Sequence, residues 1–498
     1  MRTNLLLCLF LFAALTAVSQ PKKRTFPKNI NASNRNVYYP AVSGDGISLL
    51  FMSDFTDSGQ PAINYSSKKD GINWDDPIEL PRSMNLNHLL FEGGYSLNFD
   101  GTTAYFTMER SGGLGGYDIW YSKFSAGSWQ APINYGNKLN SSANEGMPSV
   151  SSSGQSLYFC KCETMKAKEA TGCEIYVASK RGQYWENAQK LPHNINNYQP
   201  QSPKIMADGE TLIFTSKQGG SADLYLTRKK EDGSWSNPVP MSFVNSTSDE
   251  QFVSFDVKGR YLFHDIKTEK GRELEEILIP DEYKGKNVMH ILGTIAKANS
   301  SEGIEAVLKV YETSTRERIV FEELNENESF NFALKEGSIY DFSVEPNDNS
   351  YAYFSKLYNL ADMRNSPRDE LTIAFSPFKS GTEVTLGGLA FEEGKSEIIE
   401  GSTYELRRLT RLLKSNAASN FELKVHHYNY LEDDTQSSDD LTEVIIDTIL
   451  TQTEQTIQVT DTVRIAVSDT MNEMDSTTIR DRNELFEEKI EKRDSIIM

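Results

Sequence analysis

Residues that carry catalytic chemistry are scarce in this chain of 498 residues, which has only six histidines and four cysteines. The sequence contains no Gly-x-Ser-x-Gly elbow, no HExxH pair and no glycine-rich phosphate loop. Two of the histidines are adjacent in an expected strand, where their side chains would face opposite ways and could not share a metal ion. These absences predict a protein that is not an enzyme and that uses no metal or cofactor. The histidines are His88, His193, His264, His290, His426 and His427.

Long hydrophobic runs are also missing beyond residue 19, so we expect no membrane-spanning helix in the mature chain. Before that point, Arg2 precedes an apolar run over residues 5–15, and the small residues Ala-Val-Ser follow at 17–19. A basic start, a short apolar run and small residues before the cleavage point are typical of a secretory signal peptide. We therefore interpret residues 1–19 as a signal peptide, with an uncleaved anchor as the alternative, and expect the mature protein to begin at Gln20 in the periplasm.

Basic residues are fewer than acidic ones: the chain has 51 Lys and Arg residues and 71 Asp and Glu residues, which gives a net charge of −20. This balance disfavours nucleic acid and anionic lipid as direct partners. The excess is concentrated at the C-terminal end, where residues 431–498 contain 18 acidic and 6 basic residues. We interpret that segment as a solvated acidic tail.

A repeat occupies the first half of the chain. A turn glycine precedes an aromatic-rich strand five times, at spacings of 55, 53, 55 and 50 residues. A second strand follows each of the first four of these strands, and a third motif with one tryptophan closes each of those units. Four short strands per unit are typical of propeller blades, so we predict a β-propeller of about five blades over residues 20–284, closed by a terminal strand in the last blade. The turn glycines are Gly46, Gly101, Gly154, Gly209 and Gly259, and the tryptophans are Trp74, Trp129, Trp185 and Trp235.

The recurring tryptophans are expected to pack between neighbouring blades, and stacking on a glycan is the alternative. Three stretches of the second unit resemble the TolB-type propeller repeat of envelope proteins: Asp-Gly at 100–101, Gly-Gly-Tyr-Asp-Ile at 115–119 and Trp-x-x-Pro at 129–132. Residues 67–74, Ser-Lys-Lys-Asp-Gly-Ile-Asn-Trp, are similar to the Asp-box hairpin of sialidases. That resemblance implies a structural hairpin at a blade edge. A sialidase also requires an arginine cluster and a Tyr/Glu pair, which nothing in the sequence marks.

Because the protein is expected to be exported to an oxidising compartment, its cysteines can form disulfides. Cys8 lies inside the apolar run, which disfavours lipidation. Cys162 ends one expected strand and Cys173 begins the next, so they flank a hairpin of ten residues and can meet the short separation that a disulfide needs. We predict that these two form a disulfide, with Cys160 as the alternative partner. Three cysteines without a nearby histidine do not fit a zinc site.

Beyond about residue 284 the repeat ends and a second β-rich region begins. Short apolar runs such as HILGTIA at 290–296 and SFNFALK at 329–335 alternate with polar turns, and about seven strands are expected over some 85 residues. This pattern predicts a small β-sandwich over residues 285–375. The region resembles the regulatory sandwich of carboxypeptidases as it occurs in envelope proteins, which implies a spacer or a binding module.

The third region, residues 376–498, is expected to contain a helix. Ser402 and Glu405 have the spacing of a capping box, which predicts a helix start at this point. Four leucines then recur at helical spacing, and the intervening basic residues are expected to face water. The leucines are Leu406, Leu409, Leu412 and Leu413, and the basic residues are Arg407, Arg408, Arg411 and Lys414.

The strand expected after this helix, FELKVHHYNY at 421–430, resembles the start of an OmpA-type peptidoglycan-binding domain. In that family an Asp after the strand and an Arg from a later Leu-Ser-x-x-Arg-Ala helix hold the charged stem peptide. Here Tyr430 or Asn429 stands at the Asp position, and an acidic stretch and a charged helix over 480–493 follow in place of the arginine motif. The resemblance implies a degenerate domain that binds peptidoglycan weakly or not at all, unless Arg480 and Asp433 replace the missing pair.

The order of propeller, regulatory sandwich and OmpA-like domain resembles PorE-type proteins, which tether secretion machinery at the outer membrane. This resemblance implies a non-catalytic scaffold that binds envelope proteins through its propeller and associates peripherally with the outer membrane. The alternative is a propeller that binds or hydrolyses glycans in the manner of a sialidase.

Overall fold

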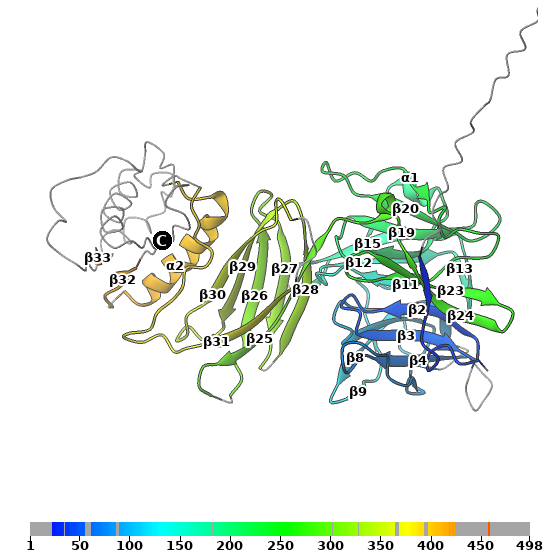
Figure 1. Ribbon diagram of the computed structural model, residues 1–498, viewed down its shortest axis with the longest axis horizontal. Coiled ribbons are helices and arrows are strands. Elements are labelled where there is room, and N and C mark those ends of the chain that lie inside the picture. Colours follow the sequence, from blue (N-terminus) through cyan, green and yellow to red (C-terminus); the bar gives the residue numbers. More distant parts are fainter. Residues whose placement is uncertain are drawn as a thin grey trace, which may run out of the picture.

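The computed structural model describes residues 22–33, 35–54, 61–85, 89–181, 184–300, 302–326, 328–363, 368–392, 397–417, 419–424 and 457–458. The expected signal peptide, its cleavage site, and the turn with Asn429 and Tyr430 lie outside these residues. Within them, no helix is both long and apolar enough to cross a membrane. A β-propeller, a β-sandwich and the helix α2 follow one another along the long axis of the molecule (Figure 1).

Five antiparallel sheets form the propeller, which confirms the predicted five blades. Their strands are, for blade 1, β2 (Val37–Val42), β3 (Ser48–Ser53), β4 (Ala62–Ser67) and β5 (Ile78–Glu79); for blade 2, β6 (Leu90–Leu97), β7 (Thr103–Met108), β8 (Asp118–Ser125), β9 (Ser128–Trp129) and β10 (Ile133–Asn134); for blade 3, β11 (Asn144–Val150), β12 (Ser156–Cys162), β15 (Glu174–Arg181), β16 (Tyr184–Trp185) and β17 (Gln189–Lys190); for blade 4, β18 (Gln201–Ile205), β19 (Thr211–Ser216), β20 (Asp223–Arg228) and β21 (Val239–Pro240); and for blade 5, β22 (Ser254–Phe255), β23 (Tyr261–Thr268), β24 (Gly271–Leu278) and β1 (Lys23–Thr25). The short helix α1 (His193–Asn196) lies between blades 3 and 4.

The N-terminal strand closes the ring, as predicted. Strand β1 pairs antiparallel with β24, so that Lys23 lies opposite Ile277. This pairing gives blade 5 the outer strand that its own sequence does not supply. The free edges that remain are short, because the outermost strands of the other blades have only two residues each, which limits edge-to-edge pairing with other chains.

An asparagine repeated in every blade bonds the third strand to the segment that follows the outermost strand of that blade. In blade 2, Ile119 donates its N–H to Asn140 Oδ1 at 2.8 Å, and Asn140 Nδ2 donates to the Ile119 carbonyl at 2.9 Å. The amide side chain thus satisfies the N–H of one strand residue and shares the carbonyl of that residue with a backbone N–H, which Tyr135 donates in blade 2. We call these contacts the asparagine clasps. They pair Asn31 with Leu274, Asn85 with Ile63, Asn140 with Ile119, Asn196 with Ile175 and Asn245 with Leu224.

The tryptophans pack between blades, as the sequence analysis expected. Trp129 of blade 2 makes an edge contact with Tyr65 of blade 1, at a ring separation of 5.6 Å. Equivalent contacts join Trp185 to Tyr135 and Trp235 to Tyr158, and Trp74 stacks on Phe26 of the closing segment. Because three of the four rings are buried and Trp74 is half-buried, they are not placed for glycan stacking.

Two facing sheets form the sandwich, and its seven strands agree with the seven expected. One sheet has the order β28-β25-β31 and the other β27-β26-β29-β30. A single apolar core, with Phe330, Phe332 and Phe342 at its centre, fills the space between them. The strands are β25 (Val288–Lys297), β26 (Ala306–Glu312), β27 (Arg318–Leu324), β28 (Ser329–Lys335), β29 (Ile339–Pro346), β30 (Phe354–Asn359) and β31 (Arg368–Phe375), and the 3-10 helix η1 (Asp281–Tyr283) lies between the propeller and the sandwich.

Beyond the sandwich, the structure describes the 3-10 helix η2 (Glu400–Ser402), the helix α2 (Thr403–Ser415), and the paired strands β32 (Glu422–Leu423) and β33 (Ile457–Gln458). The helix begins where the sequence predicted, but the capping box is wrong. Ser402 has helical backbone angles and makes no side-chain cap, because its hydroxyl bonds both backbone groups of Ala390.

The prediction that the basic residues of α2 all face water is also wrong. Arg408 is buried against the outer face of the sandwich, where its guanidinium pairs with Asp341 of β29 and with Glu405. Tyr353 donates its hydroxyl proton to Glu405 at 3.0 Å. These buried charges attach α2 to the sandwich, and a helical pattern that counts every arginine as exposed could not identify them.

Candidate functional site

The central channel of the propeller is the hollow that all five blades share. A cavity of about 80 Å³ lies on the axis, and its lining includes one equivalent residue from the inner strand region of each blade. These residues stand at equivalent positions, each five residues before the turn glycine of its blade: Ala41, Ser96, Ser149, Lys204 and Ser254. We call this set the axial ring.

Lys204 is the one cationic side chain that lines this cavity among the described residues. It is buried, and its Nζ donates to the Tyr95 carbonyl over a long distance of 3.4 Å. Burial lowers the pKa of Lys204 to about 8, because an ammonium group loses its hydration there. The carboxylate of Asp256 also lines the cavity, but it accepts the backbone N–H groups of Arg260 and Tyr261 within its own turn.

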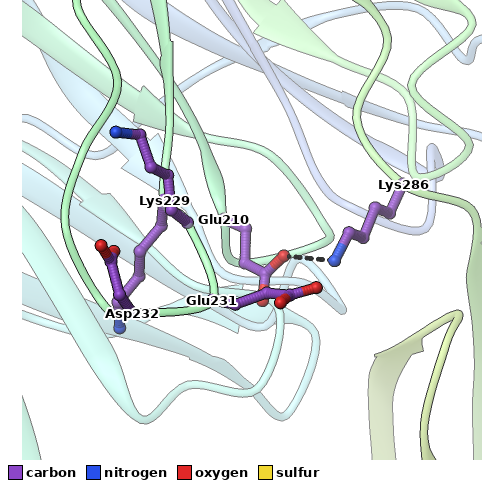
Figure 2. Close-up of a pocket in the computed structure, with 6 residues that line it drawn as sticks. Glu210, Lys229, Glu231, Asp232 and Lys286 are labelled. Carbon is purple, nitrogen blue, oxygen red and sulfur yellow. Dashed lines mark ion pairs between the residues drawn. The ribbon is translucent and has the colours of Figure 1, made fainter.

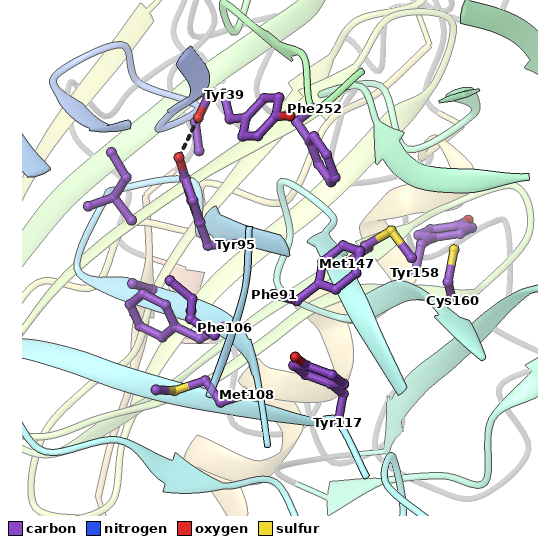
Figure 3. Packing of buried hydrophobic residues seen from close by; sticks show 14 of the residues in the cluster. Tyr39, Phe91, Tyr95, Phe106, Met108, Tyr117, Met147, Tyr158, Cys160 and Phe252 are labelled. Carbon is purple, nitrogen blue, oxygen red and sulfur yellow. Dashed lines mark hydrogen bonds between the residues drawn. The ribbon is translucent and has the colours of Figure 1, made fainter. Parts of the chain in front are cut away.

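Buried side chains from the inner strand regions of four blades pack together, and we call them the aromatic plug (Figure 3). Tyr39, Phe91, Tyr95, Met147 and Phe252 are all buried there, and Tyr95 donates its hydroxyl proton to the Tyr39 carbonyl at 2.6 Å. The inner strands reach this packing through a repeated bulge with positive φ. The residues with positive φ are Tyr39, Gly93, Met147, Ser202 and Phe252, and the Phe252 ring occupies the space that a side chain at Gly93 would need.

A small hairpin in blade 3 covers the plugged end. It consists of β13 (Thr164–Lys166) and β14 (Glu169–Thr171), and a disulfide between Cys162 and Cys173 joins the two strands at its base. Its tip reaches blade 2, because Glu92 donates its N–H to the Ala167 carbonyl at 2.6 Å and Ala167 donates its own to Tyr117 Oη at 3.0 Å. Cys160 lies buried and free beneath it, and burial raises the pKa of its thiol.

The sandwich covers the opposite end, where the turns with the repeated glycines lie. Phe99, Val288 and Ala333 form an apolar contact beside the axis, and the Phe99 ring lies 5.1 Å from the ring of His290. Polar contacts surround it: Lys286 donates its N–H to Asp208 Oδ2 at 3.0 Å, and Gln155 Nε2 donates to a sandwich carbonyl at 3.2 Å. The face formed by the turns is therefore occupied by another part of the same chain.

A second hollow, of about 470 Å³, lies at the rim between blade 4 and the start of the sandwich. Its lining mixes both signs of charge, with Lys229, Lys230, Glu231 and Asp232 on one hairpin. Figure 2 shows Glu210 and Lys286 in an ion pair across it, at 2.9 Å. Since Glu210 also pairs with Lys335 of β28, this hollow belongs to the attachment of the sandwich.

Other residues that the sequence analysis singled out do not converge on a catalytic site. No arginine lines the axial cavity among the described residues, so the arginine cluster of a sialidase-like site is not found there. Asp70 of the Asp-box accepts the N–H groups of Ile72 and Asn73 in an exposed hairpin turn, as the resemblance implied. Within the described part of the chain, no three His, Cys, Asp or Glu side chains are grouped to hold a metal ion.

Two features were missed from the sequence although a signal was present. Each clasp asparagine follows a buried apolar residue, and these pairs recur with the period of the blades: Ile30-Asn31, Met84-Asn85, Leu139-Asn140, Ile195-Asn196 and Val244-Asn245. The axial ring could have been found by counting back from each turn glycine. Lys204 is the one lysine among these five positions, where the other blades have alanine or serine, and this difference distinguishes it.

Comparisons with known proteins add little to this geometry. No family model matches the chain, and no curated protein matches it. Among solved structures, a putative TolB from Agrobacterium tumefaciens is 13% identical, with 64% of this chain and 98% of that chain covered and a TM-score of 0.32. TolB from Acinetobacter baumannii is 15% identical, with 50% and 55% covered and a TM-score of 0.31. An endo-arabinase from Bacteroides thetaiotaomicron is 16% identical, with 51% and 97% covered and a TM-score of 0.33. Similarities at this level carry no argument about function.

Proposed function

We propose that this protein is a non-catalytic scaffold of the cell envelope, which binds partner proteins through the outer surface of its propeller. The observation that carries the proposal is the closure of the channel from both ends by the chain itself. The disulfide-linked hairpin covers one end and the sandwich the other. A substrate would have to displace one of these covers to reach the axis.

The surface that remains for partners is the rim of the blades. Every large hydrophobic side chain that is strongly exposed in the described residues belongs to the propeller. Three of them, Ile78, Ile133 and Val239, lie on the outermost strands of blades 1, 2 and 4. Single exposed apolar residues are common on protein surfaces, so the support comes from their repetition on one structural element.

The envelope location rests on the sequence. A signal peptide over residues 1–19 directs export, and the Cys162–Cys173 disulfide suits an oxidising compartment such as the periplasm. Peripheral association with the outer membrane and a place in a secretion or surface assembly follow from the PorE-type order of regions. Because Asn429 and Tyr430 carry no charge, we further propose that the chain binds peptidoglycan weakly or not at all.

Site-specific photo-crosslinking in envelope fractions tests the scaffold function. A crosslinker at Ile133 or Tyr184, which are 55% and 80% exposed, should capture an envelope protein. The matched control is a crosslinker at Gln155, which the sandwich covers, and it should give only crosslinks within the chain. Failure to capture any protein at the rim, together with glycan binding or hydrolysis by the purified protein, would favour the sialidase-like alternative.

Retention on purified sacculi tests the peptidoglycan proposal separately. The protein should be retained far less than an intact OmpA-type domain run in parallel, because both charged contacts of that family are missing from the sequence. Equal retention would mean that another acid and arginine pair, such as Asp433 and Arg480, has taken over.

A further inference from the structure

We propose that the propeller axis binds a small monovalent anion of halide size, held by Lys204 and by the hydroxyl groups of Ser96, Ser149 and Ser254. The four side chains come from four different blades and line one cavity. Their equivalent positions, each five residues before a turn glycine, bring them to the same level of the channel. The fifth blade contributes Ala41, whose methyl group leaves room on the axis.

The charge balance of the cavity favours an anion. Lys204 is buried, and the described residues place no carboxylate beside its ammonium group that is not already engaged. Asp256, the one carboxylate in the lining, is bonded to two backbone N–H groups and pairs with Arg260 at 3.4 Å. A buried cation without a counter-charge is strongly disfavoured, so an ion of opposite sign stabilises this arrangement.

The serine hydroxyls supply the remaining donors. Ser149 Oγ accepts the N–H of Ile205, and Ser254 Oγ accepts the N–H of Val42, each at 3.1 Å and each from the next blade. A hydroxyl that accepts in this way still has its own proton to donate. The hydroxyl of Ser96 is buried and has no hydrogen-bond partner among the described atoms. One ammonium group and three hydroxyl protons are therefore available for a single acceptor.

The volume limits the ligand. A cavity of about 80 Å³ exceeds the roughly 30 Å³ that one water molecule occupies in the liquid, so it accommodates a halide ion. A sugar or a phosphate ester is too large. Because the aromatic plug and the sandwich cover the two ends, the ion would stabilise the contact of four blades at the axis and would exchange slowly.

Bromide is a suitable probe, since it scatters anomalously and has the expected charge and size. The mature, oxidised chain is equilibrated by long dialysis with sodium bromide or with sodium gluconate, whose anion is far larger than the cavity, at one ionic strength. We expect bromide to raise the midpoint of thermal unfolding by about 3 °C, as saturation near ten times the Kd would do. We also expect an anomalous peak within hydrogen-bond distance of Lys204 Nζ in crystals of the unaltered protein.

Lys204→Met should abolish the bromide-dependent rise, whereas Lys217→Met, at an exposed lysine of blade 4, should retain it. An equal rise in all three proteins, or no rise in any, would overturn the proposal, because bromide would then act elsewhere or not at all. The crystallographic measurement remains decisive if Lys204→Met does not fold. A peak absent from the axis in bromide-equilibrated crystals would show that Lys204 is buried without an anion.

Discussion

The propeller and the sandwich each contain a buried polar contact that holds neighbouring segments together, and the two contacts differ in kind. In the propeller, five neutral asparagines each bond both backbone groups of a strand residue, and the same contact recurs in every blade. On the outer face of the sandwich, one arginine and two carboxylates, Arg408 with Asp341 and Glu405, make the attachment of α2. The asparagines each contribute modestly to the stability of the propeller, once in every blade. The arginine contact makes one large contribution to holding α2 on the sandwich.

The difference follows from what each region must bury. A backbone amide needs one donor and one acceptor, which an asparagine supplies without a charge. A buried ion pair is stable only while all of its members are present, because loss of one leaves an uncompensated charge. A single substitution should therefore destabilise the contact between α2 and the sandwich more than it destabilises an asparagine clasp. Substitutions at each contact can test that ranking.

The largest effect is expected from Arg408→Met. This change leaves Asp341 and Glu405 buried without a cation, which typically costs about 3–5 kcal/mol. Hydrogen exchange should show that opening of α2 becomes easier by that amount while the propeller strands stay protected. Arg411→Met is the matched control, because Arg411 pairs with Glu345 on the same strand, β29, but is 60% exposed. The control should lose at most about 1 kcal/mol, and equal effects would mean that burial does not distinguish the two pairs.

The next effect in size concerns the hairpin over the plugged end of the channel. The double change Cys162→Ser and Cys173→Ser removes a link between residues 11 apart in sequence. Loop-closure entropy gives such a link roughly 3 kcal/mol, most of it through the unfolded chain. Denaturant unfolding of the variant under non-reducing conditions should show this loss, and Cys160→Ser should not. The pairing itself is checked by mass spectrometry of a non-reduced digest, in which a peptide joining Cys160 to Cys173 would contradict it.

A smaller loss is expected from breaking one asparagine clasp. Asn196→Ala leaves the N–H of Ile175 without a partner in a buried site, while its carbonyl still accepts the N–H of Leu191, and this costs about 1–3 kcal/mol. The adjacent Asn197 is exposed, so Asn197→Ala should change denaturant unfolding by less than about 0.5 kcal/mol. If Asn196→Ala destabilised the protein as much as Arg408→Met, the expected ranking of the two contacts would be wrong.

Repetition also explains which parts of the structure could be predicted. Turn glycines, tryptophans and strand alternation recur along the chain, so the five blades, their closure and the seven strands of the sandwich followed from the sequence. The clasp asparagines recur as well, but asparagine is so common in loops that its recurrence alone did not predict a structural role. Counting back from the turn glycines identifies the position of Lys204 but not its burial, and Arg408 could not be predicted at all, since a lone charge is ordinarily placed on the surface. The capping box failed because a distant segment, at Ala390, takes the Ser402 hydroxyl.

The contact between the two regions contains a carboxyl group that titrates near neutrality. Glu322 of β27 faces the propeller, and burial together with the charge of Asp100 raises its pKa from 4.5 to about 7, although the nearby Lys180 acts in the opposite direction. A group whose pKa is higher in the folded protein binds its proton more tightly there than in the unfolded chain. Its contribution to stability is therefore complete below about pH 4.5 and is lost as the pH rises through 7.

Glu322→Gln mimics the protonated side chain at every pH, so it should remove the loss of stability that Glu322 causes as the pH rises through 7. The pKa shift alone would correspond to about 3 kcal/mol. Because Glu322 is only partly buried, solvent screens its charge and reduces this effect. We therefore expect the variant to be more stable than the wild type by about 1 kcal/mol at pH 8. At pH 4.5 the two proteins should unfold at the same denaturant concentration, and Glu317→Gln, at an exposed position before β27, should behave like the wild type throughout. A variant that was less stable at pH 8 would show that the attraction between Glu322 and Lys180 outweighs the cost of burying the carboxylate.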